Sequence, residues 1–270
     1  MPDPSNETER PNEPYAYFVR EATTRFRPTQ YVGGAWDTRE QHIAPPIGLL
    51  AHVIEADLAA RRGHDQRLTR LSCDILGVIP LEPIEVQVQV LRPGRTIELV
   101  EARLSHAGRD AVIARAWLTA RYDTAALQGS ELPRMKPRDQ MAPWGLDSVW
   151  PGEFVKTPQI WREELAVGRV QFWVRSPVPL LTGEEVSRTA NMFRLIDISN
   201  GVAARVPPEE VLYPNLDLTA HLYRAPEGDL TGLDTTVSFG PDGAGLTHSV
   251  LHDEQGPIGA FMQTLTVRPR

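Results

Sequence analysis

The sequence predicts an α+β fold in which two antiparallel sheets each wrap around a long helix. The first observation is length, because 270 residues are enough for two domains of roughly 130 residues each. The second is that one order of elements, a strand, a helix and then several strands, occurs twice along the chain. The third is a proline-rich stretch between the two runs, which has little periodicity and is typical of a connection.

The first run contains one clear helix preceded by strands. Residues 15–36 are rich in Thr, Tyr, Phe and Val and predict one or two strands, and Gly33-Gly34 permits a sharp turn at their end. A helix begins near Pro45-Pro46, because proline is tolerated in a first turn, and ends near Arg61-Arg62-Gly63. The apolar residues at helical spacing are Ile47, Leu50, Ala51, Ile54 and Leu58.

An antiparallel meander follows this helix. Apolar and polar residues alternate over 84–90, which predicts a strand with one solvated face. A turn at 92–95 leads to a strand over 96–105, and a loop at 106–110 leads to a strand over 111–122. The first half therefore reads as one long helix against one antiparallel sheet.

The second half repeats this order after the connection. We place the first domain at 14–125, the connection at 126–156 and the second domain at 157–270. Residues 166–175 predict a strand, and residues 184–206 predict a helix that is broken near its middle. The strands predicted after this helix cover 215–224, 233–239, 246–252 and 257–267.

The duplication has a physical reason. A lone unit of one sheet and one helix leaves the edge of its sheet exposed and has a small core. Two such units placed side by side can join their sheets and cover each other. The closing hairpins of the two halves match, because Gly108-Arg109-Asp110 and Gly256-Pro257 each lead into a long final strand.

Composition excludes several classes of function. A formal net charge of −7 argues against a nucleic-acid-binding surface. No apolar run approaches the roughly 18 to 20 residues that span a bilayer, so we expect no membrane insertion. The stretch Met1–Glu7 lacks the basic start and apolar run of a secretory signal, and Cys73 is the only cysteine, so we expect a cytoplasmic protein without an internal disulfide and with Cys73 in or near the core.

Common catalytic motifs are missing from the sequence. The seven histidines show no metal-binding spacing, and His248 and His252 lie too far apart on a strand to share a zinc ion. There is no Gly-x-Ser-x-Gly, which argues against a nucleophile-elbow hydrolase. No glycine-rich phosphate loop follows a strand, which argues against Rossmann and P-loop folds.

Several stretches occur in the order and spacing of a known family. In the first half they are 33–37, 46–50 and 92–95, and in the second half 195–201, 215–224 and 253–263. Together they resemble the acyl-CoA thioesterase II-like double-hotdog proteins. The resemblance implies hydrolysis of fatty acyl-CoA to free fatty acid and CoA without a metal or an organic cofactor. It also implies a homodimer or a larger homo-oligomer.

The resemblance also implies a set of residues that position and polarise the attacking water. The family has an Asp on the second helix, a Ser or Thr on the next strand and a Gln on the last strand. The Asp falls on Asp197 and the Gln on Gln263, whereas the hydroxyl position, counted back from Arg224, falls on Asn215. An amide can also bind a water molecule, and Thr219 is the alternative because we expect it to share a strand face with Asn215.

These positions are weighed against ordinary structural roles. Asp197 lies in an otherwise apolar helix, where burial of a carboxylate needs a reason, and Gln263 lies among apolar residues on the final strand. The residues expected to meet the CoA phosphates are Arg92, Arg95 and Arg224, although arginines in turns are often only solvated.

In the first half, superposing the closing hairpins puts Ala114 or Arg115 at the position of Gln263, which predicts one working site per chain. Asp37 and His42 flank the first helix and are candidates for a remnant site there.

Two other functions remain open at this point. One is an enoyl-CoA hydratase on the same scaffold, although its Gly-Asp-x-Asn-Pro-type signature is missing and Asp37 and His42 have only its spacing. The other is a non-catalytic acyl-CoA-binding protein with a decayed site, because Asn215 stands where the family has a hydroxyl.

Overall fold

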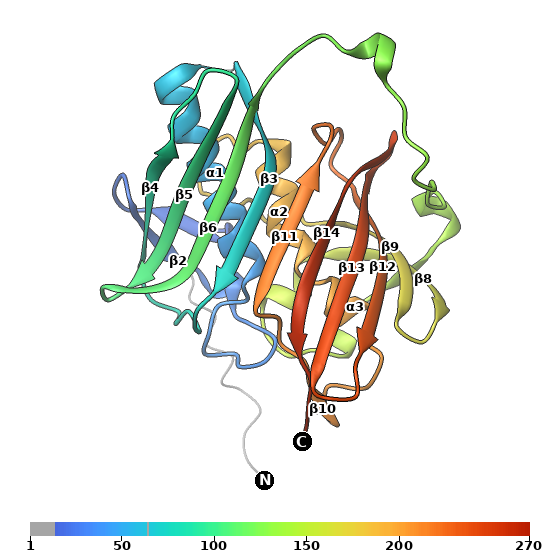
Figure 1. Ribbon diagram of the computed structural model, residues 1–270. Coiled ribbons are helices and arrows are strands. Elements are labelled where there is room, and N and C mark those ends of the chain that lie inside the picture. The colour runs from blue at the N-terminus through green and yellow to red at the C-terminus, as the bar shows by residue number, and fades with distance from the viewer. Residues whose placement is uncertain (1–13, 64) are drawn as a thin grey trace.

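The structure is a computed structural model that describes residues 14–63 and 65–270 (Figure 1). The N-terminal stretch considered above for a targeting signal lies outside these residues. Among the described residues, no helix is both long enough and apolar enough to cross a membrane.

Each half of the chain begins with strands, continues with a helical segment and ends with a series of strands. The first half comprises β1 (Phe18–Arg20), β2 (Arg25–Pro28), α1 (Ala44–Arg62), β3 (Gln66–Ile75), β4 (Ile84–Arg92), β5 (Ile97–His106) and β6 (Arg109–Ala120). The rest comprises β7 (Ala142–Trp144), β8 (Gln159–Ala166), β9 (Arg169–Arg175), α2 (Arg188–Ile196), α3 (Ser199–Val202), β10 (Val211–Leu212), β11 (Asp217–Leu222), β12 (Thr231–Phe239), β13 (Ala244–Asp253), β14 (Gly256–Thr266) and β15 (Arg268–Pro269).

The two half-sheets form one antiparallel sheet. Its strand order is β1-β2-β4-β5-β6-β3-β11-β14-β13-β12-β9-β8-β7, so β3 and β11 join the halves at the centre. The helices α1 and α2 pack against each other and lie behind the sheet in the view of Figure 1. The predicted α+β double-hotdog architecture is thereby confirmed, with the two predicted sheets continuous as one.

Helix α1 forms as its sequence predicts. Pro45 and Pro46 occupy its first turn, all five apolar residues at helical spacing are buried, and Gly63 ends it with a φ of 69°. Gly48 lies where α1 crosses α2, because a Cβ atom built there would be 2.5 Å from the Cβ of Arg194. The missing side chain at Gly48 therefore lets the two helices approach closely.

The second helix is broken, as predicted, although it is shorter than 184–206. α2 begins after Ser187, whose Oγ accepts a hydrogen bond from the N–H of Ala190 at 3.0 Å. It ends at Asp197, and the single turn of α3 follows. This break places Asp197 between two helical segments.

Some strands were not predicted. The central strand β3 has a register shift between Leu68 and Arg70, which interrupts the alternation of buried and exposed residues. Cys73, expected in or near the core, is fully buried on this strand. The strand expected over 166–175 includes the last residue of β8, a turn at Gly168 and all of β9.

The connection between the halves carries structure of its own. β7 pairs with β8 at the edge of the sheet, and Leu146, Trp150 and Phe154 are buried. The domain boundaries at 125 and 156 stay predictions.

Candidate active site

A cavity of about 460 Å³ opens between the two halves. The first half contributes the loop 34–43 and the residues after β3, 75–79. The second half contributes Asp197 and its neighbours in α3, together with residues 214–216. Trp150 of the connection completes the wall, so the cavity depends on both halves being joined.

Asp197 is the buried carboxylate of this cavity. Its residue surface is only 3% exposed, and its Oδ1 atom accepts hydrogen bonds from Asn215 Nδ2 at 2.8 Å and from Gln263 Nε2 at 2.7 Å. Its Oδ2 atom accepts none from the described residues and is not among the fully enclosed unpaired atoms. Because Asp197 lines the cavity, this oxygen faces the cavity.

Burial changes the acidity of this carboxyl group. It raises the pKa of Asp197 from 3.8 to about 7, while the hydrogen bonds from Asn215 and Gln263 act in the opposite direction. A carboxylate whose pKa is near neutrality can take a proton from water more readily than an ordinary surface carboxylate.

Gln263 lies behind Asp197 and does not line the cavity. Its side chain is fully buried on the inner face of β14, and Ser199 Oγ donates a hydrogen bond to its Oε1 at 3.3 Å. Ser199 thus fixes which end of the carboxamide points at Asp197. The structure brings Gln263 to the carboxylate, as expected, but gives it no place for direct contact with water in the cavity.

Asn215 reaches Asp197, whereas Thr219 does not. In the pairing of β11 with β14, Thr219 lies opposite Met262. The same register would place Leu216 opposite Leu265. The residue opposite Leu265 is instead Asn215, so the register shifts by one residue before β11 begins. This one-residue shift turns Asn215 to the inner face of the sheet and leaves Thr219 on the outer face, where its Oγ1 is 2.8 Å from Ser72 Oγ. The expectation that Asn215 and Thr219 share a face is therefore wrong.

Asn200 was not singled out from the sequence. It follows Asp197 by three residues, lines the cavity and is only 8% exposed. The only sequence signal for Asn200 and Ser199 is that two polar residues interrupt an apolar helical segment.

Asp37 and His42 belong to the same cavity and form no separate site. Burial lowers the pKa of His42 to about 3, so its ring is neutral, and its Nδ1 accepts a hydrogen bond from the N–H of Ala44 at 3.1 Å. Asp37 forms an ion pair with Arg39 at 2.6 Å, and the hydrogen bonds from Arg39 lower the pKa of Asp37 to about 2. Neither side chain is placed to act as a base at neutral pH.

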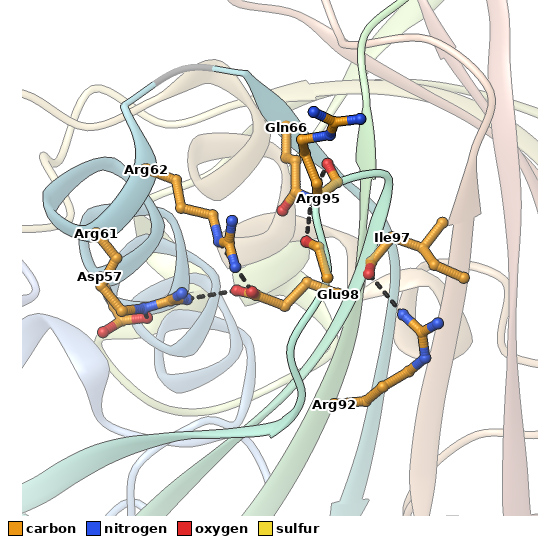
Figure 2. Close-up of polar contacts among 9 residues, drawn as sticks. Asp57, Arg61, Arg62, Gln66, Arg92, Arg95, Ile97 and Glu98 are labelled. Atoms are coloured by element: carbon orange, nitrogen blue, oxygen red, sulfur yellow. Dashed lines mark hydrogen bonds and ion pairs between the residues drawn. The ribbon is translucent and has the colours of Figure 1, made fainter.

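Arg92, Arg95 and Arg224 lie away from the cavity. Ile75, at one end of β3, lines the cavity, whereas Gln66 at the other end donates hydrogen bonds to the backbone carbonyls of Gly94 and Arg95 at 2.9 Å. Because β3 spans ten residues, these ends are about 30 Å apart. Figure 2 shows Arg92 donating to the carbonyl of its own turn at Ile97.

Arg224 lies at that same distant end and forms a structural contact. Arg67 Nη2 donates to the carbonyl of Tyr223, which places this turn beside the start of β3. The Arg224 guanidinium pairs with the buried Asp253 and donates to the carbonyls of Gly256 and Pro257. The structure thus does not bring the three arginines to the site, whose wall instead includes Arg268.

The matching position in the first half lacks both functional groups. The final strands of the two halves, β14 and β6, begin at Gly256 and Arg109, and each has a one-residue register shift just after its hairpin. The two strands can therefore be compared residue by residue. Gln263 is seven residues after Gly256, and Ala116 is seven residues after Arg109, so these two positions align. This corrects the expected Ala114 or Arg115. If the contact of Gly48 with Arg194 is taken as the point where the two helices match, counting three residues from it aligns Asp197 with Ala51. In this alignment alanine stands at both positions.

The described residues contain no group of three or more His, Cys, Asp or Glu side chains arranged to hold a metal ion.

Solved structures share this fold. A conserved protein of unknown function with a hot dog fold from Alicyclobacillus acidocaldarius is 11% identical, with a TM-score of 0.70, covering 93% of this chain and 95% of the other. Acyl-CoA thioesterase II TesB2 from Mycobacterium marinum is 16% identical, with a TM-score of 0.64 and coverages of 94% and 96%. A tesB protein from Mycobacterium avium subs paratuberculosis is 14% identical, with a TM-score of 0.64 and coverages of 93% and 96%.

Family models match both halves of the sequence. Residues 32–119 match the acyl-CoA thioesterase N-terminal domain, and residues 130–267 match the acyl-CoA thioesterase C-terminal domain. A search of curated proteins found no match. The two domain matches, in this order and over most of the chain, show that the protein belongs to the acyl-CoA thioesterase family.

Proposed function

We propose that this protein hydrolyses fatty acyl-CoA to free fatty acid and CoA by direct attack of a water molecule activated by Asp197. One observation carries the proposal: a buried carboxylate has one oxygen fixed by two amides and the other oxygen facing a cavity. Family membership supports the thioester as the bond that is broken.

In the proposed reaction, Asp197 is the one protein group that takes up and releases a proton. The water oxygen forms a bond to the thioester carbonyl carbon while Asp197 Oδ2 takes a proton from it. The tetrahedral intermediate then collapses, the C–S bond breaks, and its electron pair leaves with the sulfur. The proton held by Asp197 passes to this sulfur, which yields CoA and the fatty acid. A general base of this kind contributes roughly 100- to 10,000-fold in rate.

The amide partners have a positioning role in this scheme. Gln263 and Asn215 both donate to Oδ1, so the carboxylate cannot rotate and Oδ2 stays directed at the cavity. Burial keeps the pKa of Asp197 near neutrality, which suits a base that must accept and then release a proton. Asn215 thus replaces the hydroxyl of the family with a donor that still reaches the carboxylate.

The test is release of CoA thiol from a purified preparation. The protein is given acyl-CoAs from acetyl to palmitoyl with a thiol-reactive dye, alongside Asp197→Ala and Gln263→Ala. We expect thiol release that both substitutions reduce by at least roughly 100-fold. Thr219→Val is the matched control, because Thr219 lies on the outer face of the sheet, and it should keep the wild-type rate.

Other outcomes would select another function. Addition of water to enoyl-CoA without thiol release would identify a hydratase. Binding of acyl-CoA with neither activity would identify a non-catalytic acyl-CoA-binding protein. Either result would overturn the proposal.

A further inference from the structure

The proposed hydrolysis needs a donor for the carbonyl oxygen, which becomes negatively charged as water attacks. The start of a helix is a common source of such donors. Here α1 begins beside the cavity, but the N–H of Ala44 donates to His42 and Pro45 and Pro46 have no N–H. The next N–H, of Ile47, donates to the carbonyl of Ile43 at 3.0 Å. The first turn of α1 therefore offers no free donor.

Asn200 has a free donor in the cavity. Its Oδ1 accepts a hydrogen bond from the N–H of Gly201 at 2.9 Å, which fixes the orientation of the carboxamide because only the oxygen can accept. Its Nδ2 donates to none of the described residues and is not among the fully enclosed unpaired atoms. Because the residue is 8% exposed and lines the cavity, this N–H group faces the cavity.

The other side-chain amides and hydroxyls of the cavity wall donate within the protein. Gln41 Nε2 donates to the carbonyl of Pro80 at 2.8 Å, and Thr266 Oγ1 donates to the carbonyl of Pro214 at 3.3 Å. Asn215 Nδ2 donates to Asp197 and to the carbonyl of Asp217. Asn200 is thus distinguished from them by a donor left for a ligand.

We infer that Asn200 Nδ2 donates a hydrogen bond to the thioester carbonyl oxygen and stabilises the oxyanion that forms there. Residues three apart along a helical path share a face, so Asp197 and Asn200 approach the substrate from one wall. Asp197 addresses the water and Asn200 addresses the carbonyl. This inference rests on the proposed hydrolase function.

The kinetic test compares Asn200→Ala and Asn200→Asp with the wild type. Loss of one oxyanion donor typically costs roughly 100- to 1,000-fold in kcat, so we expect Asn200→Ala to lose this much with KM changed less than about threefold. Asn200→Asp should lose at least as much, because a carboxylate repels the oxyanion. Gln87→Met is the control: it removes an exposed amide on β4, away from the residues that line the cavity, and should keep kcat within about threefold.

A binding test separates contact with the carbonyl from a structural role. A ketone analogue of acyl-CoA keeps the carbonyl and replaces the sulfur by CH₂, whereas a thioether analogue keeps the sulfur and lacks the carbonyl. Asn200→Ala should weaken binding of the ketone relative to the thioether by roughly tenfold, as expected for one lost hydrogen bond in a buried site. Gln87→Met should leave this ratio unchanged.

The outcomes are distinguishable from failure of the hydrolase proposal. If the wild type releases thiol and Asn200→Ala keeps its kcat, the oxyanion role is refuted and hydrolysis stands. If both analogues lose affinity equally in Asn200→Ala, Asn200 supports the cavity without touching the carbonyl, and the inference is refuted. If the wild type releases no thiol, the hydrolase proposal fails, whereas the ratio of ketone to thioether affinity still reports whether Asn200 meets a carbonyl.

Discussion

Asp197 is only 3% exposed, and this burial raises the pKa of its carboxyl group from 3.8 to about 7. The folded protein therefore binds more protons than the unfolded chain between these two values. Stability must fall as pH rises through this window, and the loss is complete above about pH 7. The total loss in the free energy of unfolding is at most roughly 4 kcal/mol.

Asp197→Asn should therefore stabilise the protein at about pH 8, because the neutral amide avoids this cost while its Oδ1 still accepts from Asn215 and Gln263. Urea unfolding at about pH 8 and at about pH 4 checks this. The stabilisation should be large at the higher pH and small at the lower pH, where the carboxyl group is protonated in the folded state. Equal effects at both pH values would contradict the raised pKa.

Arg224 gives a second prediction, about structure and not about substrate. Its partner Asp253 is 1% exposed, so Arg224→Gln leaves a buried carboxylate with only the N–H groups of Glu227 and Gln255. We expect a loss of roughly 2–3 kcal/mol in the free energy of unfolding with KM for acyl-CoA unchanged. Arg92→Gln is the control, because its exposed side chain only meets its own turn, and it should change stability by less than about 0.5 kcal/mol. A raised KM in either variant would return these arginines to the CoA site.

The sequence located some of these residues and missed others for physical reasons. Asp197 was readable because a carboxylate in an apolar helix needs a partner. Asn215 was assigned by counting, but the register shift that turns it inward and Thr219 outward leaves no mark in composition. The arginines were misplaced because a turn does not reveal at which end of the sheet a cavity opens.

At the scale of elements, the contact of α1 with α2 positions the site. Gly48 meets the backbone of Arg194, and Asp197 follows Arg194 by three residues. Gly48→Ala would add a Cβ atom 2.8 Å from the Cα and 2.9 Å from the N of Arg194. Helix propensity alone would raise the free energy of unfolding by about 1 kcal/mol, whereas overpacking would lower it by roughly 1–3 kcal/mol. The sign of the measured change in stability therefore shows which of the two effects is larger.

We expect Gly48→Ala to lower the midpoint of thermal unfolding and to reduce thiol release, because the helices must separate near Asp197. Gly129→Ala is the control, since among the described residues no atom beyond its two chain neighbours lies within 4 Å of the added Cβ, and it should be neutral. A stabilised and fully active Gly48→Ala would show that the two helices tolerate a wider spacing.

Regular elements were predictable where their periodicity was unbroken. The alternation over 84–90 gave β4, and the spacing of apolar residues gave α1. β3 was missed because its bulge between Leu68 and Arg70 removes the alternation, although it is the strand that joins the halves. β7 and β8 were missed because their pairing is between segments that have little pattern of their own.

At the scale of the whole molecule, we expect the duplication to yield one equipped site per chain. Ala51 and Ala116 align with Asp197 and Gln263 when the halves are matched at the helix contact and at the closing hairpins, and the cavity draws its walls from both halves. We therefore infer that the first half helps to build a pocket whose reactive groups come from the second half. Calorimetric titration with the thioether analogue should give one binding site per chain, and two equivalent sites per chain would contradict this division of roles.

The central claim, that the cavity-facing carboxylate of Asp197 is the base, is tested most directly by the pH dependence of kcat/KM for thiol release. Asp197 must be ionised to take a proton, so the account predicts that kcat/KM falls about tenfold per pH unit below a midpoint near 7. Asp197→Asn should remove this limb and be at least roughly 100-fold slower at about pH 8. A wild-type profile that is flat down to about pH 5, or an Asp197→Asn variant with wild-type activity, would contradict it.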